Sequence, residues 1–202
     1  MSLFSFANRL LHGLELRWKL GYRGTMAYSR HRKAILEAPP IGPLVDDSAE
    51  IHIITSRKEW LNALWGLYSF YHFSGERYRL CLHEDGSLGE AESGAIRKLL
   101  PGARVIPDSQ SSEEVLRWLA PFPRCQIIRK TKFISKKEFD FNFYLEAPIG
   151  ILFDSDLIFY ARPDFVCDEL IGKRQPGNWV NRDVHPGLSL TSDRIREKWG
   201  MK

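Results

Sequence analysis

The stretch at residues 149–159 reads IGILFDSDLIF and decides how the fold is interpreted. Its first part, from Ile149 to Phe153, is an apolar run with one glycine, which predicts a strand buried on both faces. Two carboxylates, Asp154 and Asp156, follow this strand directly, and apolar residues resume after them. Because ligands of open α/β sheets bind beyond the carboxyl ends of the strands, we expect the two aspartates at a ligand site.

The chemistry of the two aspartates indicates a hard divalent cation. Carboxylates are rarely buried unless they are paired or bound to metal, and Mg²⁺ and Mn²⁺ prefer oxygen ligands. Such a cation completes its shell with water and substrate phosphates, so the protein would contact a nucleotide diphosphate through the metal. The other interpretation is a polar turn, since Asp and Ser favour turns. The apolar strand before Asp154 and the apolar run after Asp156 favour the metal.

Upstream of the motif, apolar runs and helical periodicities alternate along the chain. The spacing predicts strands over residues 51–55, 78–83, 104–106 and 149–153, an extended segment over 157–160 and a further strand over 178–181. It predicts helices over residues 60–73, 89–100, 112–119, 124–139 and 193–199, the third with Ser112 as its N-cap. This order predicts an α/β fold in which a largely parallel layered sheet has helices on both faces.

The beginning of the chain differs from the rest in charge. Residues 1–33 hold seven basic side chains against one acidic side chain, whereas the whole chain has a net charge of +4. Apolar residues at spacings of three and four predict an amphipathic helix there, followed by a Pro-rich linker at residues 38–43. This helix would either pack its apolar stripe on the body or dock on a membrane surface or a partner. We therefore divide the chain into a helical arm with its linker, residues 1–45, and a body, residues 46–202.

The composition excludes several classes of protein. With 202 residues, 44% of them hydrophobic and 27% charged, the chain suits one domain with a sizeable core. Three cysteines exclude a disulfide-stapled secreted scaffold, and no apolar run is long enough to cross a bilayer, so we expect a cytoplasmic protein that contacts the membrane at most through its arm. The histidines and cysteines lack the spacing of a zinc site, so we interpret His52 and His83 as strand residues rather than ligands. No P-loop, dinucleotide-binding glycine motif or nucleic-acid-binding motif is present.

The segment ILFDSDLIFYARP, which ends with Arg162 and Pro163, resembles the DxD region of the GT-A glycosyltransferases, the nucleotide-diphospho-sugar transferases. The resemblance in element order covers residues 50–199, but only the DSD segment is specific. It implies a Rossmann-like GT-A sheet that binds a nucleotide-sugar donor with Mn²⁺ or Mg²⁺. Residues 46–202 would then be the nucleotide-sugar-binding domain.

The resemblance also implies roles for individual residues. Asp156 would be the metal ligand, Asp154 would contact the ribose or the metal's water shell, and Ser155 would reach the nucleoside. The base and ribose would lie against the residues after the first two strands, namely Thr55, Ser56, Arg57, Glu84 and Asp85. A basic residue before the motif would face the phosphates, with Lys132 preferred over Arg129 and Lys130.

Each of these positions outside the aspartate pair has an equally good structural explanation. Thr55 and Ser56 could cap the helix that follows them, and Asp85 with Gly86 is a common turn pair. The lysines between residues 130 and 137 could form the solvated face of a helix.

The sequence identifies no catalytic base. An inverting transferase needs a carboxylate that takes the acceptor's proton, and nothing selects one of the available carboxylates, Asp164, Asp168, Glu169 and Asp183. Members of the GT-A family continue well beyond the motif, so we expect the acceptor-binding part to be missing from this sequence.

These observations predict a metal-dependent glycosyltransferase with an unknown acceptor, or the donor-binding half of one. Two alternatives stay open. The first is a nucleotidyl- or phosphoryl-transfer enzyme that uses the same two aspartates, and the second is a non-catalytic interaction module.

Overall fold

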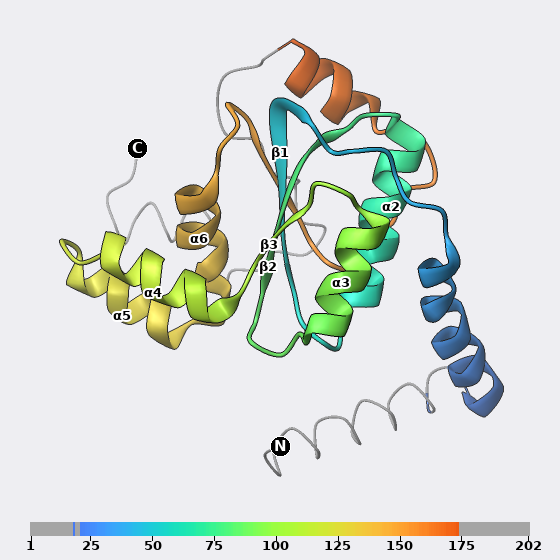
Figure 1. Cartoon of the computed structure of the whole chain (residues 1–202), viewed down its shortest axis with the longest axis horizontal. Helices are drawn as coiled ribbons and strands as arrows, with labels where there is room; N and C mark the ends of the chain where they lie inside the picture. Colours follow the sequence, from blue (N-terminus) through green and yellow to red (C-terminus); the bar gives the residue numbers. More distant parts are fainter. Residues whose placement is uncertain (1–17, 19–20, 174–202) are drawn as a thin grey trace, which may run out of the picture.

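The computed structural model describes residue 18 and residues 21–173, and the structural statements below concern these residues. A four-stranded sheet forms the centre, with the strand order β3-β2-β1-β4 and all neighbouring strands parallel (Figure 1). The strands are β1 (Asp46–Thr55), β2 (Tyr78–Glu84), β3 (Arg104–Ile106) and β4 (Gly150–Phe153). The predicted α/β class is confirmed, and the sheet is parallel throughout.

Helices cover both faces of the sheet. In Figure 1, α2 and α3 lie on one side of the strands, and α4, α5 and α6 lie on the other side. The bounds of these helices are α2 (Trp60–Ser74), α3 (Glu90–Leu99), α4 (Asp108–Trp118), α5 (Pro123–Thr131) and α6 (Lys136–Tyr144). Also present are the 3-10 helices η1 (Ile35–Glu37) and η2 (Phe133–Ser135) and the π-helix η3 (Phe165–Gly172).

Alternation along the strands divides the buried side chains between two cores. Ile53 of β1 and Leu82 of β2 belong to the larger core, which α2 and α3 fill from one face. Cys81 of β2 belongs to a second core, to which β3, α4 and α6 contribute. Because successive strand residues point to opposite faces, His52 and His83 lie on the same side as Cys81. The first face of the sheet is therefore mainly apolar, and the second face carries polar side chains.

The motif strand β4 lies at the edge of the sheet, next to β1. Its Phe153 is buried, but Leu152 is 59% exposed, so the prediction of a strand buried on both faces is wrong. Leu152 is in register with His52 and shares its face. The second core covers that face at β2 and β3, which leaves Leu152 at the uncovered end.

One helix begins earlier than its apolar periodicity predicts. Instead of beginning at residue 112, α4 begins at Asp108, with Pro107 as its N-cap residue. Pro107 has an extended backbone (φ −63°, ψ 145°), which is the non-helical conformation typical of an N-cap residue, and its ring fixes this φ. The prediction of Ser112 as the N-cap is therefore wrong, because this residue lies inside α4.

The prediction of one helix over much of residues 124–139 is also wrong. Lys132 has an extended backbone (φ −121°, ψ 105°) and ends α5, and α6 begins only after η2. The break allows α6 to pack beside α5, so that the guanidinium of Arg129 meets the carboxylate of Asp140. The contact between Arg129 of α5 and Asp140 of α6 thus outweighs the periodicity that favours one continuous helix.

The segment after the motif packs on α2 instead of continuing as a strand. Residues 157–160 form no strand hydrogen bonds, so this segment is not a further strand of the sheet. The backbone N–H of Phe159 donates to Oγ of Ser69 at 3.0 Å, and the carbonyl oxygen of Leu157 lies close to Gly66. These contacts with α2 determine where the chain leaves the motif.

Part of the predicted arm lies within the described residues. Residues 21–34 are helical, and the end of this helix contacts α2, because the indole N–H of Trp65 donates to the carbonyl of Arg32 at 3.2 Å. Trp18 and Met26 are exposed. Docking of the arm on a membrane or a partner stays a prediction. The strand predicted over 178–181 and the helix predicted over 193–199 lie outside the described residues.

Within the described part of the chain, no helix combines the length and the apolar character that crossing a membrane requires.

We predict that Gly66→Ala destabilises the protein although alanine favours helices. A Cβ atom at this position would lie 2.6 Å from the backbone oxygen of Leu157, so the segment after the motif must shift. The free energy of unfolding, measured by urea denaturation, should fall by about 1–3 kcal/mol.

The matched control is Gly94→Ala in α3, where a Cβ atom meets no other atom within 4 Å. There the helix propensity acts alone, so the free energy of unfolding should rise by up to about 1 kcal/mol. Equal effects of the two substitutions would contradict the close approach at Gly66.

Candidate functional site

The carboxyl-terminal edge of the sheet collects the polar residues that follow the strands. Because all four strands are parallel, the residues after Thr55, Glu84, Ile106 and Phe153 meet at this edge. The chain runs from β1 outward to β2 and β3, and then returns to place β4 on the other side of β1. The edge between β1 and β4 is thus the point where the strand order reverses, which is where open α/β sheets bind ligands.

The two aspartates of the motif have different surroundings. Asp154 is 61% exposed and forms an ion pair with Lys137, the second residue of α6. Asp156 is exposed and has no hydrogen-bond or ion-pair partner among the described residues. Ser155 between them is half-buried.

This difference decides which carboxylate is available to a cation. The ammonium group of Lys137 already compensates the charge of Asp154, and a cation at Asp154 would have to displace it or lie beyond it. Asp156 has its oxygen atoms in solvent and is available as a direct ligand. Carboxylate oxygens are the donors that Mg²⁺ and Mn²⁺ prefer, so the residues present fit such a cation, with Asp156 as the direct ligand.

The end of β1 and the turn that follows it hold three of the predicted site residues, Thr55, Ser56 and Arg57. Ser56 Oγ accepts the backbone N–H of Glu59 at 3.3 Å within the turn before α2, but the N-cap residue of α2 is Glu59, so the prediction that Ser56 caps this helix is wrong. Nε of Arg57 donates to Glu92 of α3 at 3.0 Å, so this side chain is held against a neighbouring helix. The hydroxyl Oγ1 of Thr55 is buried at the end of β1 and has no partner within the described structure.

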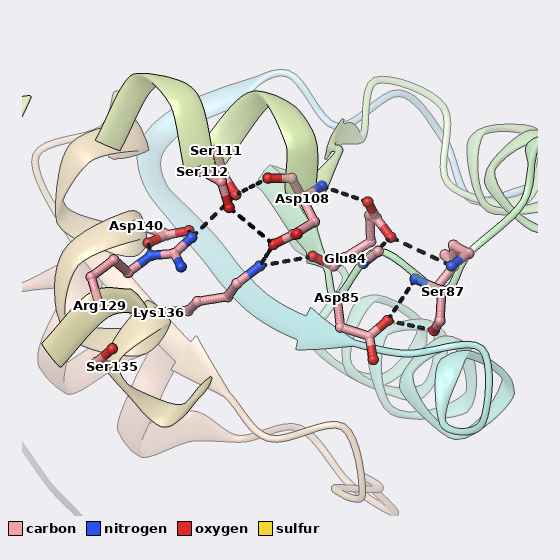
Figure 2. A network of polar contacts seen from close by, with 12 residues as sticks. Glu84, Asp85, Ser87, Asp108, Ser111, Ser112, Arg129, Ser135, Lys136 and Asp140 are labelled. Atoms are coloured by element: carbon pink, nitrogen blue, oxygen red, sulfur yellow. Dashed lines mark hydrogen bonds and ion pairs between the residues drawn. The ribbon is translucent and has the colours of Figure 1, made fainter. Parts of the chain in front are cut away.

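The residues after β2 form a second turn, which Figure 2 shows from close by. The buried carboxylate of Glu84 accepts the N–H of Gly86 at 2.6 Å and the N–H of Asp108 at the beginning of α4. Asp85 accepts the N–H of Ser87 at 3.0 Å, as expected for a turn residue. Glu84 thereby holds the ends of β2 and β3 together.

Lys136 joins α6 to this edge. Its side chain is 4% exposed, and its ammonium group donates to the carbonyl oxygen of Glu84 at 3.2 Å and to the carboxylate of Asp108 (Figure 2). The interpretation of these lysines as a solvated helix face fails for Lys136. No periodicity distinguishes it from Lys137, because its burial results from the break before α6.

Arg129 serves a structural role. Its guanidinium group donates to the buried carboxylate of Asp140 at 2.7 Å and to the hydroxyl of Ser111 at 3.4 Å (Figure 2). Lys132, preferred from the sequence as the phosphate contact, is exposed at the end of α5. Lys137 of α6 contacts the motif instead.

An open pocket of about 410 Å³ lies at the end of the sheet near β2 and β3. Its lining is mostly charged or polar and consists of Asp85, Asp108, Ser112, Leu116, Arg129, Lys130, Thr131 and Lys136. The structure therefore brings Asp85 together with Arg129 and Lys130 in one pocket. The aspartates of the motif and Thr55 do not line it. Lys136 lines this pocket, and the next residue of α6, Lys137, forms the ion pair with Asp154.

The second face of the sheet buries side chains whose pKa values are shifted, namely His83, Cys81 and Glu50. Burial lowers the pKa of His83 to about 2, and the positive charges of Lys136 and Arg104 contribute in the same direction. Burial raises the pKa of the Cys81 thiol to about 12. Burial alone would raise the pKa of Glu50, but hydrogen bonds from His52, the Glu146 N–H and Arg104 outweigh it and lower this pKa to about 2.

Comparison with known proteins adds no assignment, because no family model, no curated protein and no solved structure matches this chain. The resemblance to GT-A glycosyltransferases thus stays a prediction that depends on the residues of the motif and on their position in the fold.

We predict that Asp140→Ala is strongly destabilising. The substitution leaves the 6% exposed guanidinium of Arg129 without its carboxylate partner, and breaking a buried ion pair in this way costs about 3–5 kcal/mol. Chemical denaturation measures this loss. The control Glu113→Ala breaks the exposed pair with Arg117 on α4 and should change the free energy of unfolding by less than about 0.5 kcal/mol. Similar losses for both would show that Arg129 is not confined by Asp140.

Proposed function

We propose that the carboxyl-terminal edge of the sheet binds the diphosphate of a nucleotide-sugar donor through a divalent cation and that the protein takes part in sugar transfer. The observation that carries this proposal is Asp156. It is a carboxylate without a partner in the described structure, and it follows the strand that lies at the reversal of strand order. Mn²⁺ or Mg²⁺ is the proposed cation, with Asp156 as its ligand and Asp154 beside it.

The surroundings of the motif support a ligand at this edge. The buried hydroxyl of Thr55 lacks a partner at the end of β1, the neighbouring strand, and a ligand hydroxyl or base edge would satisfy it. Buried polar groups are normally hydrogen-bonded, so this atom is an exception that a ligand would explain. The pocket beside β2 has the size of a small-molecule site and carries Asp85, the residue proposed for the nucleoside.

The proposed chemistry breaks the bond between the anomeric carbon and the diphosphate oxygen and forms a bond from that carbon to an acceptor oxygen. The diphosphate leaves with the bonding electrons, and the acceptor's proton passes to a base that is not assigned. A bound divalent cation would stabilise the negative charge that develops on the leaving group. Lys137 lies beside the motif and would contribute a second positive charge, whereas Asp156 and Asp154 orient the donor.

A non-catalytic interaction module is the second candidate, and specific contacts favour it. Asp154 is neutralised by Lys137, Ser56 caps a turn, and Asp85 accepts hydrogen bonds within its own turn. These contacts are what a scaffold without a ligand would show. Such a module has no reason to bind a nucleotide in a cation-dependent way.

We predict that UDP, GDP or CDP stabilises the protein only when Mn²⁺ is present. At a ligand concentration of a hundred times the Kd, binding adds about 2.7 kcal/mol, which corresponds to a rise in Tm of about 5–10 °C for a chain of this size. Thermal-shift titrations with each nucleotide, with and without Mn²⁺, measure this effect. Asp156→Ala should abolish it, because the cation loses its direct ligand.

The matched control is Asp47→Ala, which removes an exposed carboxylate at the opposite end of β1 and should leave the shift intact. A shift that survives Asp156→Ala would refute the site assignment. The absence of a shift with all three nucleotides would refute the donor-binding proposal and support the interaction module.

A further inference from the structure

We propose that His52, Cys81 and His83 form a buried structural site for zinc(II), separate from the aspartates of the motif. The three residues come from β1 and β2 on the second face of the sheet. His52 and Cys81 are partners in the parallel register of the two strands, and His83 follows Cys81 by two residues on the same face. All three side chains are fully buried or nearly so.

The donor atoms converge on one point. Nδ1 of His52 lies 3.1 Å from Nε2 of His83, and Sγ of Cys81 lies 3.5 Å from the same Nε2. With Zn–N bonds of about 2.0–2.1 Å and a Zn–S bond of about 2.3 Å, tetrahedral geometry requires about 3.3 Å between two nitrogens and about 3.6 Å between nitrogen and sulfur. All three atoms lie within 4.8 Å of one another, so a side-chain adjustment of about 1 Å completes the arrangement.

A carboxylate orients one of the ligands from behind. Nε2 of His52, on the far side of the ring from the proposed ion, lies 3.2 Å from a carboxylate oxygen of Glu50. Metal-bound histidines almost always donate their second N–H in this way, and the partner fixes the ring and its tautomer. Glu50 is itself held at 2.7 Å by Arg104 and at 2.8 Å by the N–H of Glu146.

The site is closed to solvent. The ring of Phe141 from α6 lies against both histidines, with centroid distances of 5.3 Å to His52 and 4.6 Å to His83. Structural zinc sites are closed to solvent, whereas catalytic sites keep a position open to exchanging water or substrate. Three protein ligands converge here, so an enclosed water molecule would be the fourth donor of the tetrahedral shell. We therefore assign the ion a stabilising role, in which it joins β1 to β2 and enters while the chain folds.

The donor set selects this metal over the cation proposed for the motif. Imidazole nitrogen and thiolate sulfur suit zinc, whereas Mg²⁺ and Mn²⁺ prefer oxygen. The two metal proposals use different residues and different ions, so either can fail without the other.

The same atoms could instead form a metal-free chain of hydrogen bonds. With Nε2–H of His52 donating to Glu50, its Nδ1 would accept a proton from Nε2 of His83. In the zinc-bound form, that proton resides on Nδ1 of His83, and the thiol of Cys81 has lost its own. The experiment below distinguishes the two arrangements.

The test refolds the full chain from denaturant with zinc(II) or cobalt(II), removes unbound metal and measures metal content by mass spectrometry. The expected result is one equivalent of either ion, a higher Tm than that of protein refolded with chelator, and the near-ultraviolet thiolate-to-cobalt absorption band. Refolded protein without bound metal, or with cobalt but without the thiolate band, would overturn the proposal and leave the hydrogen-bonded chain.

Two variants locate the site. The double variant Cys125→Ser, Cys167→Ser retains Cys81 as the only thiol and should keep the cobalt band, because neither replaced cysteine belongs to the cluster. Loss of the band in this variant would overturn the assignment to Cys81.

Glu50→Gln should weaken zinc binding by about 10–100-fold, as expected when the group that orients a ligand is altered. Unchanged zinc affinity in Glu50→Gln would also contradict the site.

Discussion

The parallel pairing of β1 with β2 on one side and with β4 on the other is the constraint on which the rest of the structure depends. The register places Thr55 beside Glu84 and Ile53 beside Phe153, so the chain leaves all three strands at one edge. An antiparallel β4 would carry Asp154 to the opposite edge, far from the turns after β1 and β2. The same register brings His52 beside Cys81, so the cluster on the second face also results from this pairing.

The two faces of the sheet contribute differently to the protein. The face under α2 and α3 is a mainly apolar core, and burial of apolar surface there supplies most of the stability. The other face buries Glu50, His52 and the pair of Arg129 with Asp140. Buried charges repay their desolvation only when they are well paired, so these polar pairs add little net stability beyond the apolar contacts of the second core. Its polar contacts instead determine how α5 and α6 pack against the sheet.

The sequence predicted the four strands of the sheet, α2 and α3, because buried β-branched runs and helical spacing are local signals, but it began β1 at residue 51 instead of Asp46. It failed where a distant contact decides: the break at Lys132, the exposure of Leu152 at the sheet edge and the burial of Lys136 all depend on neighbours far along the chain. For the site, the sequence predicted the position of the two aspartates after a strand. It did not predict that Asp154 has an ion-pair partner, Lys137, whereas Asp156 has none among the described residues. It could not reveal the histidine–cysteine cluster either, because its ligands converge only through strand register.

The ion pair of Asp154 with Lys137 has a consequence for how a donor would bind. Two exposed carboxylates two residues apart repel each other, and Lys137 offsets one of these charges. A diphosphate arriving alone would meet the uncompensated charge of Asp156, whereas a cation at Asp156 removes this repulsion and attracts the phosphates. Lys137 could then move from Asp154 to the diphosphate without leaving a carboxylate uncompensated, because the proposed cation would lie beside both aspartates. The ion pair would therefore make binding of the cation and of the nucleotide depend on each other, with no change in the fold.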